Sequence, residues 1–323
     1  MKRIAVLTSG GDAPGMNPAI RAVVRAAVAH GLEIFGIQRG YQGLIDGALS
    51  AMDARSVSGI IHHGGTILRT ARCPDFMNAE GRARAADQLR RLEIEGLVVI
   101  GGDGSYRGAY ELWRDHGTAC VGIPGTIDND IGGTQYTIGF DTALNTAVEA
   151  IDRLRDTAAS HDRIFFVEVM GRHSGFIAMY SGLAGGAEGI LVPENTTDIP
   201  ALIASLREAS ARGKKSMIIV VAEGDDAGSA FEIARQVAGG SEYKDVRVSV
   251  LGHLQRGGAP SAFDRVLAAR MGVAAVEALL DGAANVMVAM ENNAIVRKPI
   301  ADAWETRNVF DPNLFPMTSL LSV

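Results

Sequence analysis

The chain has 323 residues, of which 47% are apolar and 21% are charged, and its formal net charge at pH 7 is −6. This length and composition are typical of a folded protein with two average domains or one large domain. The mildly acidic balance excludes a general electrostatic attraction to nucleic acid or to an anionic membrane surface. Glycine is unusually frequent, with 39 residues, which indicates tight turns and close approach of the backbone to ligands.

The cysteine content and the N-terminal segment indicate the cellular compartment in which the protein is expected. Cys73 and Cys120 are too few for a disulfide framework or a structural zinc site. The apolar run at residues 4–7 is too short for a signal peptide. No apolar run approaches the ~18 residues of a membrane span. We therefore expect a cytoplasmic protein.

One pattern recurs along the chain: an apolar run, then a glycine-rich or charged turn, then a helical pattern. The apolar runs predict strands at residues 4–7, 97–100, 120–123, 164–169, 217–222 and 246–251. The periodicity predicts helices at about 80–92, 105–116, 141–158, 198–212 and 261–281. Such alternation is typical of buried parallel strands in an α/β fold. Ligands bind beyond the carboxyl ends of such strands, so the polar clusters that follow them are expected to converge.

The first helix and the C-terminal segment have further readable features. Asn17 is predicted to cap a helix that has Pro18 in its first turn. The segment 308–323 is predicted to be irregular. The inner face of the first helix is predicted to comprise Ile20, Val23, Val24, Ala27 and Val28.

Two predicted strands end in Gly-Gly-Asp, at residues 10–12 and 101–103. Backbone N–H groups in such turns can donate to phosphate oxygens, and the helix that follows adds its positive end. Either turn alone could be a simple helix cap, but two at one edge favour phosphate binding. Mg²⁺ is bound through one or two carboxylates plus substrate phosphates, so Asp103 is the candidate ligand, with Asp130 able to help through water. The chain lacks both the G-x-x-x-x-G-K-[ST] motif and a G-x-G-x-x-G after the first strand.

The segment 124–130 is the densest polar cluster. Asp128 and Asp130 would repel each other unless a cation or a ligand separates their roles. One could bind metal while the other accepts the proton of a hydroxyl nucleophile, as in phosphoryl transfer. The structural alternative is an Asx-rich turn.

Arginine recurs near the predicted strand ends. Four such residues in comparable positions indicate a small, multiply charged anionic substrate, because arginine binds phosphate in a bidentate manner. Glu223 ends an apolar run and could accept hydrogen bonds from sugar hydroxyls or cap a helix. Of the four arginines, Arg163 stands just before a predicted strand, Arg172 and Arg256 follow strands, and Arg247 lies within one.

At these motifs the sequence resembles the bacterial 6-phosphofructokinase family. The resemblance implies a glycolytic kinase that transfers the γ-phosphoryl group of ATP to the 1-hydroxyl of fructose 6-phosphate with Mg²⁺. It also implies two Rossmann-like three-layer α/β domains with mainly parallel sheets and the active site in the cleft between them. We expect a larger ATP-binding domain at 1–140 plus 253–303, and a smaller fructose 6-phosphate-binding domain at 141–252 plus 304–323. The matching stretches are residues 7–17, 99–105, 124–130, 170–172 and 251–258.

The resemblance also implies roles for individual residues. Asp128 matches the catalytic base and Asp103 the Mg²⁺ ligand, while Thr126 lies beside the reacting phosphoryl group and Arg72 and Arg172 stabilise its charge. The sugar-phosphate site is implied to comprise Thr126, Asp128, Met170, Gly171, Arg172, Glu223, His253 and Arg256, with Arg163 and Arg247 from a neighbouring subunit. The ATP site is implied to comprise Gly11, Tyr41, Arg72, Cys73, Gly102, Asp103, Gly104, Ser105 and Gly108.

The same resemblance implies a homotetramer and an effector site for ADP or phosphoenolpyruvate. Family members usually have Arg-Tyr where this chain has Ala54-Arg55, so one expected phosphate contact differs. Pyrophosphate-dependent relatives tend to carry aspartate at the position of Gly104 and lysine at that of Gly125, so the two glycines favour ATP. The effector residues are implied to be Arg21, Arg25, Arg155, Glu188 and Lys214.

Three alternatives remain open at this point. A pyrophosphate-dependent enzyme of the same fold would differ in its phosphoryl donor. Lipid and NAD kinases share a Gly-Gly-Asp-Gly turn, but not the segments 124–130 and 253–258. A catalytically silent sensor would bind fructose 6-phosphate without releasing ADP.

Overall fold

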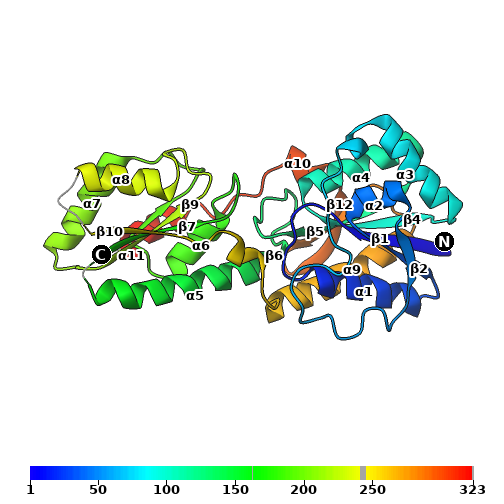
Figure 1. Ribbon diagram of the computed structural model, residues 1–323, viewed down its shortest axis with the longest axis horizontal. Coiled ribbons are helices and arrows are strands. Elements are labelled where there is room, and N and C mark those ends of the chain that lie inside the picture. Colours follow the sequence, from blue (N-terminus) through cyan, green and yellow to red (C-terminus); the bar gives the residue numbers. More distant parts are fainter. Residues whose placement is uncertain (162, 241–244, 322–323) are drawn as a thin grey trace. The chain divides into compact units, whose positions relative to one another are not determined.

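The computed structural model describes residues 1–161, 163–240 and 245–321, and its helices and strands are labelled in Figure 1. The chain divides into two compact units. The first unit consists of Met1–Ile127, Ile131–Thr142 and Arg256–Asn308. The second unit consists of Asp128–Asp130, Ala143–Gln255 and the residues from Val309 onward. Unlike the predicted domains, these units assign residues 128–130 and 253–255 to the second unit, and residues 141–142 and 304–308 to the first.

The first unit contains a mainly parallel sheet in the order β12-β11-β5-β4-β1-β2-β3, with β6 beside β5. Among the described strands of this sheet, only the edge strands β3 and β12 run antiparallel to their neighbours. Its strands are β1 Arg3–Thr8, β2 Glu33–Ile37, β3 Leu49–Met52, β4 Gly96–Gly101, β5 Ala119–Thr126, β6 Ile138–Gly139, β11 Val286–Glu291 and β12 Ala294–Pro299.

Helices cover both faces of this sheet, which is why its central strands are continuously apolar. Helices α1 and α9 pack on one face, and α2, α3 and α4 pack on the other (Figure 1). Alternate residues of β1 and β4 therefore enter different cores; Leu7 and Val99, for example, face α2, α3 and α4. The helices are α1 Met16–Ala29, α2 Gly40–Asp46, η1 Pro74–Met77, α3 Ala79–Arg91, α4 Asp103–His116, α9 Ala262–Leu280 and α10 Asp302–Glu305.

The second unit contains a four-stranded parallel sheet in the order β10-β7-β9-β8. Helices α7 and α8 bury Phe166 and Ile219 on one face, and α6 packs on the other. Helix α5 (Phe140–Ala159) begins in the first unit and continues into the second. The remaining elements are β7 Ile164–Val169, α6 Phe176–Ala184, β8 Gly189–Leu191, α7 Ile199–Ala211, β9 Met217–Ala222, α8 Ala230–Gly240, β10 Val246–Val250, η2 Gly252–Arg256 and α11 Leu314–Leu321.

The predicted fold class is confirmed, and every predicted strand and helix is present. None of the helices in the described residues is long and apolar enough to cross a membrane. The prediction of an irregular C-terminal segment is wrong, because residues 314–321 form α11. Val28 is 42% exposed and does not belong to the inner face of α1.

The predicted cap of the first helix is also wrong. Helix α1 begins at Met16 after Gly15, whose φ of 112° suits glycine, so Asn17 lies inside the helix. The amide of Asn17 donates to the carbonyl oxygens of His63 (3.2 Å) and Gly64 (3.0 Å). Its oxygen accepts from the backbone N–H of Ile67 at 2.8 Å. This buried side chain therefore anchors the segment that follows β3 rather than the helix end.

Candidate functional site

In the first unit, β1, β4 and β5 are neighbouring parallel strands, so their carboxyl ends lie at one edge of the sheet. The backbone N–H of Ser9 donates to the carbonyl oxygen of Ile100 at 3.0 Å, which joins the ends of β1 and β4. Thr126 ends β5 at the same edge. The structure thus brings Gly11, Gly102 and Thr126 to one edge, as the motifs predict.

The glycines at this edge have different surroundings. A Cβ at Gly101 would lie 2.5 Å from the carbonyl oxygen of Ser9 and 2.6 Å from Oγ of Ser105, so no side chain fits there. At Gly102 and Gly104 a Cβ would meet nothing within 4 Å. Helix α4 begins at Asp103, so the positive end of its dipole lies at this edge of the sheet. Open space beside a helix N-terminus suits an anionic ligand such as phosphate.

Arg256 lies against the turn that follows β1. Its Nη1 donates to the carbonyl oxygen of Asp12 at 3.0 Å. A Cβ at Gly11 would lie 2.5 Å from the same Nη1, so glycine is needed for this approach. The structure therefore places Arg256, which was assigned to the sugar-phosphate site, beside Gly11, which was assigned to the ATP site.

Asp103 has the chemistry expected of a Mg²⁺ ligand. Its half-buried carboxylate occupies the first position of α4. Within residues 1–161, 163–240 and 245–321, no three His, Cys, Asp or Glu side chains gather closely enough to form a metal cluster. Mg²⁺ that arrives with a nucleotide needs only one or two carboxylates, because phosphates complete its shell. Asp103 fits that mode of binding.

Tyr41 packs beneath the first turns of α4. Its ring stacks on Phe76, with centroids 4.0 Å apart, and its hydroxyl donates to the carbonyl oxygen of Ser105. A Cβ at Gly108 would lie 2.8 Å from the Tyr41 ring. Burial raises the pKa of the Tyr41 phenol well above its ordinary value. The tyrosine therefore remains a neutral hydrogen-bond donor that supports Ser105.

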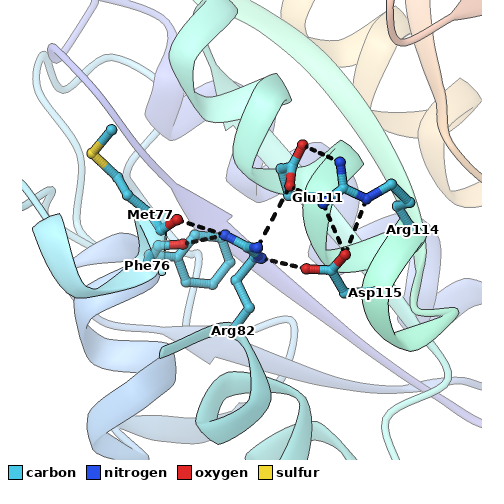
Figure 2. Close-up of polar contacts among 6 residues, drawn as sticks. All are labelled: Phe76, Met77, Arg82, Glu111, Arg114 and Asp115. Carbon is cyan, nitrogen blue, oxygen red and sulfur yellow. Dashed lines mark hydrogen bonds and ion pairs between the residues drawn. The ribbon is translucent and has the colours of Figure 1, made fainter. Parts of the chain in front are cut away.

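Arg82, which is not among the residues predicted from the sequence, anchors η1, the segment directly after Arg72 and Cys73. Arg82 lies on α3 and is 8% exposed. Its Nη1 donates to the carbonyl oxygens of Phe76 (3.3 Å) and Met77 (2.8 Å), as Figure 2 shows. The guanidinium therefore connects η1 with α3.

The same guanidinium reaches two carboxylates of α4. Nε of Arg82 donates to Asp115 at 2.7 Å, and Nη2 lies 3.6 Å from Glu111 (Figure 2). The exposed Arg114 also pairs with both carboxylates. An arginine predicted on the inner face of one helix, with two acids one turn apart on the next helix, is the sequence signal that could have revealed this network.

In the second unit, the segments after β7, β9 and β10 form the carboxyl edge of the sheet. The Glu223 carboxylate accepts from the backbone N–H groups of Gly171 (3.3 Å) and Arg172 (2.7 Å). The buried Gln255 accepts from the N–H of Met170 at 3.3 Å and donates to the carbonyl oxygen of Gly252 at 3.1 Å. Side chains that follow β9 and β10 thus shape the loop that follows β7.

This loop has an unusual backbone. Arg172 has a φ of 58°, and Gly171 has a φ of 148°. A Cβ at Gly171 would lie 2.2 Å from the carbonyl oxygen of Ser174, so only glycine fits. The Ser174 hydroxyl donates to the carbonyl oxygen of the buried Asp128 at 3.0 Å. Asp128, Arg172 and Glu223 therefore belong to one connected set of loops.

Arg163 and Arg247 lie at the opposite, amino edge of this sheet. Nε of Arg163 is 2.9 Å from Oδ2 of Asp245, and Nη2 of Arg247 is 2.7 Å from Oδ1 of the same residue. The hydrogen bond from Arg163 and the charges of both arginines lower the pKa of Asp245. The six residues of β7 lie between Arg163 and Arg172 and span roughly 20 Å at ~3.3 Å per residue. The prediction that the four arginines occupy comparable positions is therefore wrong.

Three of the five predicted effector residues also meet at this amino edge. The buried carboxylate of Glu188 pairs with Nζ of Lys214 at 2.9 Å and with Nη1 of Arg155 at 3.5 Å. Arg155 also donates to the carbonyl oxygens of Gly185 (2.7 Å) and Gly186 (2.6 Å). The other two predicted residues, Arg21 and Arg25, lie on α1 in the first unit.

Comparison with known proteins places these sites in a family context. The family model described as "Phosphofructokinase" matches residues 3–279. The chain is 54% and 55% identical to the proteins named "ATP-dependent 6-phosphofructokinase" of Bacillus velezensis and Bacillus subtilis, over 323 residues and 100% of each chain. The phosphofructokinase structure from Saccharomyces cerevisiae matches with a TM-score of 0.88 and 37% identity, covering 94% of this chain and 45% of that chain. The pyrophosphate-dependent phosphofructokinase from Marinobacter aquaeolei shares the fold, with a TM-score of 0.84 and 23% identity, covering 97% of this chain and 86% of that chain.

Proposed function

The chain belongs to the phosphofructokinase family, and from this premise we propose that it transfers the γ-phosphoryl group of ATP to the 1-hydroxyl of fructose 6-phosphate. The products are fructose 1,6-bisphosphate and ADP, and the reaction is a glycolytic step. The observation that carries the proposal is the 55% identity, over its whole length, to an enzyme named for this activity.

The nucleotide is proposed to bind at the carboxyl edge of the first unit. Its phosphates would accept hydrogen bonds from the turn after β1 and from the first turn of α4, where Gly102 and Gly104 leave open space. Asp103 would hold Mg²⁺, which neutralises charge on the phosphates when it is bound. Arg72 and Cys73, held near α4 through η1 and Arg82, are proposed to complete this site together with Gly11, Tyr41, Ser105 and Gly108.

The sugar phosphate is proposed to bind at the carboxyl edge of the second unit. Asp128 would accept the proton of the attacking hydroxyl, and Arg172 would stabilise charge on the transferring group. Arg172 has a left-handed backbone conformation, and the carboxylate of Glu223 stabilises it. A strained conformation persists only where the surrounding structure fixes it, and such residues cluster at active sites, which supports this role. The other proposed contacts are Thr126, Met170, Gly171, Glu223, His253 and Arg256.

Two glycines support ATP rather than pyrophosphate as the donor. At Gly104 a Cβ would meet nothing within 4 Å, so the absence of a side chain there leaves room for a nucleotide phosphate. At Gly125 a Cβ would lie 3.1 Å from Cγ2 of Ile100 and 3.4 Å from Cε of Met16, so a lysine would require these side chains to move. Neither position therefore carries the side chain that the pyrophosphate-dependent relatives tend to have.

The amino edge of the second unit supports a role in an oligomer. Arg163 and Arg247 lie at the end of β7 remote from Arg172, so the sugar phosphate they would contact is that of a neighbouring copy in a homotetramer. Arg155 and Lys214, with Arg21 and Arg25, are proposed to bind ADP or phosphoenolpyruvate as effectors. Pairing with Glu188 preorganises Arg155 and Lys214 for such an anion.

The proposed function is tested by steady-state formation of fructose 1,6-bisphosphate from fructose 6-phosphate, using ATP and then pyrophosphate as donor. We expect turnover with ATP alone. Turnover only with pyrophosphate would contradict the choice of donor. Binding of fructose 6-phosphate without release of ADP would instead indicate a silent sensor. Repeating the assay with ADP and phosphoenolpyruvate tests the effectors.

A further inference from the structure

Asp264 is a fully buried carboxylate that the proposed chemistry does not use. It lies in the first turn of α9 and is 0% exposed. Burial of a carboxylate is costly unless hydrogen bonds compensate it. We therefore expect Asp264 to stabilise the segment that donates hydrogen bonds to it.

That segment consists of β6 and the beginning of α5. Oδ1 of Asp264 accepts from the backbone N–H of Gly139 at 2.8 Å. Oδ2 accepts from the backbone N–H of Thr142 at 2.8 Å and from the Thr142 hydroxyl. Ser261, the N-cap of α9, donates its own N–H to the Thr142 hydroxyl at 2.9 Å and its hydroxyl to Asp141. The N-terminus of α9 thus holds residues 139–142 through several connected bonds.

The same segment contacts the end of β5, where Thr126 lies. Strand β6 pairs with β5 so that Gly139 is the register partner of Thr126. The Thr137 hydroxyl donates to the carbonyl oxygen of Thr126 at 2.7 Å. Residues 137–142 therefore connect Asp264 to the backbone of Thr126, and Asp128 follows two positions later.

The segment also packs against the turn that precedes α1. A Cβ at Gly139 would lie 2.7 Å from Cβ of Ala13, and a Cβ at Gly15 would lie 2.5 Å from Cγ2 of Ile138. This close packing leaves no room for β6 to move sideways without disturbing its neighbours. A displacement of residues 139–142 would therefore displace the backbone of Thr126 as well.

From these contacts we propose that Asp264 is a positioning residue for phosphoryl transfer, which acts through β6 on the backbone of Thr126 and Asp128. This inference rests on the proposed function. Displacement of reacting groups by about 1 Å can cost about 100-fold in rate. The ionised carboxylate has the acceptor capacity that these donors require, and an amide in its place would direct an N–H group at one of them.

The test measures kcat and KM for ATP in full-length variants. For Asp264→Asn we expect kcat to fall by about 10- to 100-fold while KM for ATP stays within about threefold, because Gly102–Ser105 lie at the N-terminus of α4 and not on the segment that Asp264 holds. Thr142→Val, which removes one donor, should lower kcat by about 3- to 10-fold, whereas Thr142→Ser, which keeps the hydroxyl, should retain wild-type kcat. If Asp264→Asn does not fold, the comparison of kcat between Thr142→Val and Thr142→Ser tests the inference.

The matched control is Asp281→Asn at the other end of α9, where the exposed carboxylate pairs with Arg297 at 2.7 Å. This variant should keep wild-type kcat. Amide hydrogen exchange of residues 137–142 supplies a readout besides activity, and should increase in Asp264→Asn but not in Asp281→Asn. An inactive wild-type protein would overturn the proposed function, while the exchange data would still test the anchoring.

Two results would overturn the inference itself. One is a kcat for folded Asp264→Asn within about twofold of wild type. The other is an equal loss of kcat in Thr142→Val and Thr142→Ser, because a role that depends on the hydroxyl predicts different values for the two variants.

Discussion

The carboxylate of Glu223 accepts the backbone N–H of Arg172 at 2.7 Å, and so maintains a residue whose φ of 58° lies in the left-handed region. For a residue other than glycine, this conformation costs roughly 1–2 kcal/mol. One side chain at the end of β9 thus determines the direction of an arginine at the end of β7. Replacement of Glu223 is expected to act through Arg172 as well as through any contact with the sugar.

For Glu223→Ala we expect KM for fructose 6-phosphate to rise by at least about tenfold, since a bond to a charged acceptor contributes about 1.5–3 kcal/mol. Glu223→Gln keeps an acceptor oxygen for the two N–H groups and should lose less affinity. Steady-state kinetics with varied fructose 6-phosphate provide the measurement. Equal KM values for the two variants would show that the backbone bonds do not matter.

Asp128 is the proposed base, and its replacement tests the chemical step. For Asp128→Ser we expect kcat to fall by about 10²- to 10⁴-fold, the usual contribution of a general base. Affinity for ATP should change little, because the proposed nucleotide contacts lie on other residues. The measurements are kcat and an equilibrium titration with ATP. Turnover near that of the wild type would refute the assignment.

The central strands could be predicted from sequence because helices cover both faces of each sheet. Burial on two sides makes β4 and β9 continuously apolar, which is a strong local signal. The edge strand β12 was missed because none of its residues is fully buried, so it lacks a continuously apolar run. Helix α11 was missed for a different reason: its eight residues include Pro316, which argues locally against a helix.

The parts of the candidate site that directly follow a parallel strand could be predicted from the sequence. Turns after β1, β4 and β7 were identified because residues that follow parallel strands share an edge. The same rule, applied strictly, would have separated Arg163, which precedes its strand, from Arg172, which follows it. Arg82 and Asp264 could not be found in this way, because their partners lie on elements distant in sequence.

Arg82 is expected to contribute both to stability and to nucleotide binding. Removal of one partner from a buried ion pair costs about 3–5 kcal/mol, and since Glu111 and Asp115 remain partly exposed and paired with Arg114, we expect about 2 kcal/mol for Arg82→Met. Freed from Arg82, η1 should position Arg72 and Cys73 less well, so KM for ATP should rise several-fold.

The matched control for Arg82 is Arg114→Met. Arg114 contacts the same two carboxylates, but its side chain is 50% exposed. Exposed ion pairs contribute about 0–1 kcal/mol, so denaturant unfolding should detect little change and KM for ATP should remain that of the wild type. Similar losses in both variants would indicate that the carboxylates, rather than the carbonyl oxygens of η1, explain the effect.

Arg247 tests the contact proposed between copies of the chain. Arg247→Ser should raise KM for fructose 6-phosphate with little change in KM for ATP. Because Arg247 also pairs with Asp245, the control is Asp245→Asn, which removes the shared carboxylate and keeps both arginines. An unchanged KM for fructose 6-phosphate in Arg247→Ser would argue against the intersubunit role.

Asp264 gives the stability a predictable dependence on pH. Burial raises the pKa of Asp264 from 3.8 to about 6, partly opposed by its hydrogen bonds, and the nearby charge of Asp141 acts in the same direction as burial. An acid with a raised pKa in the folded state contributes stability that is fully present below its unfolded pKa. This contribution is lost as the pH rises through the folded pKa.

The free energy of unfolding of the wild type, relative to that of Asp264→Asn, should therefore fall by about 3 kcal/mol between pH 3.5 and pH 7, at ~1.36 kcal/mol for each unit of the shift. Denaturant unfolding of both proteins across this range provides the measurement, with Asp281→Asn as the control for a carboxylate on the same helix. A difference that stays constant with pH would show that Asp264 titrates alike in the folded and unfolded chains. A difference that grows in favour of the wild type would mean that the hydrogen bonds from Gly139 and Thr142 outweigh the cost of burial.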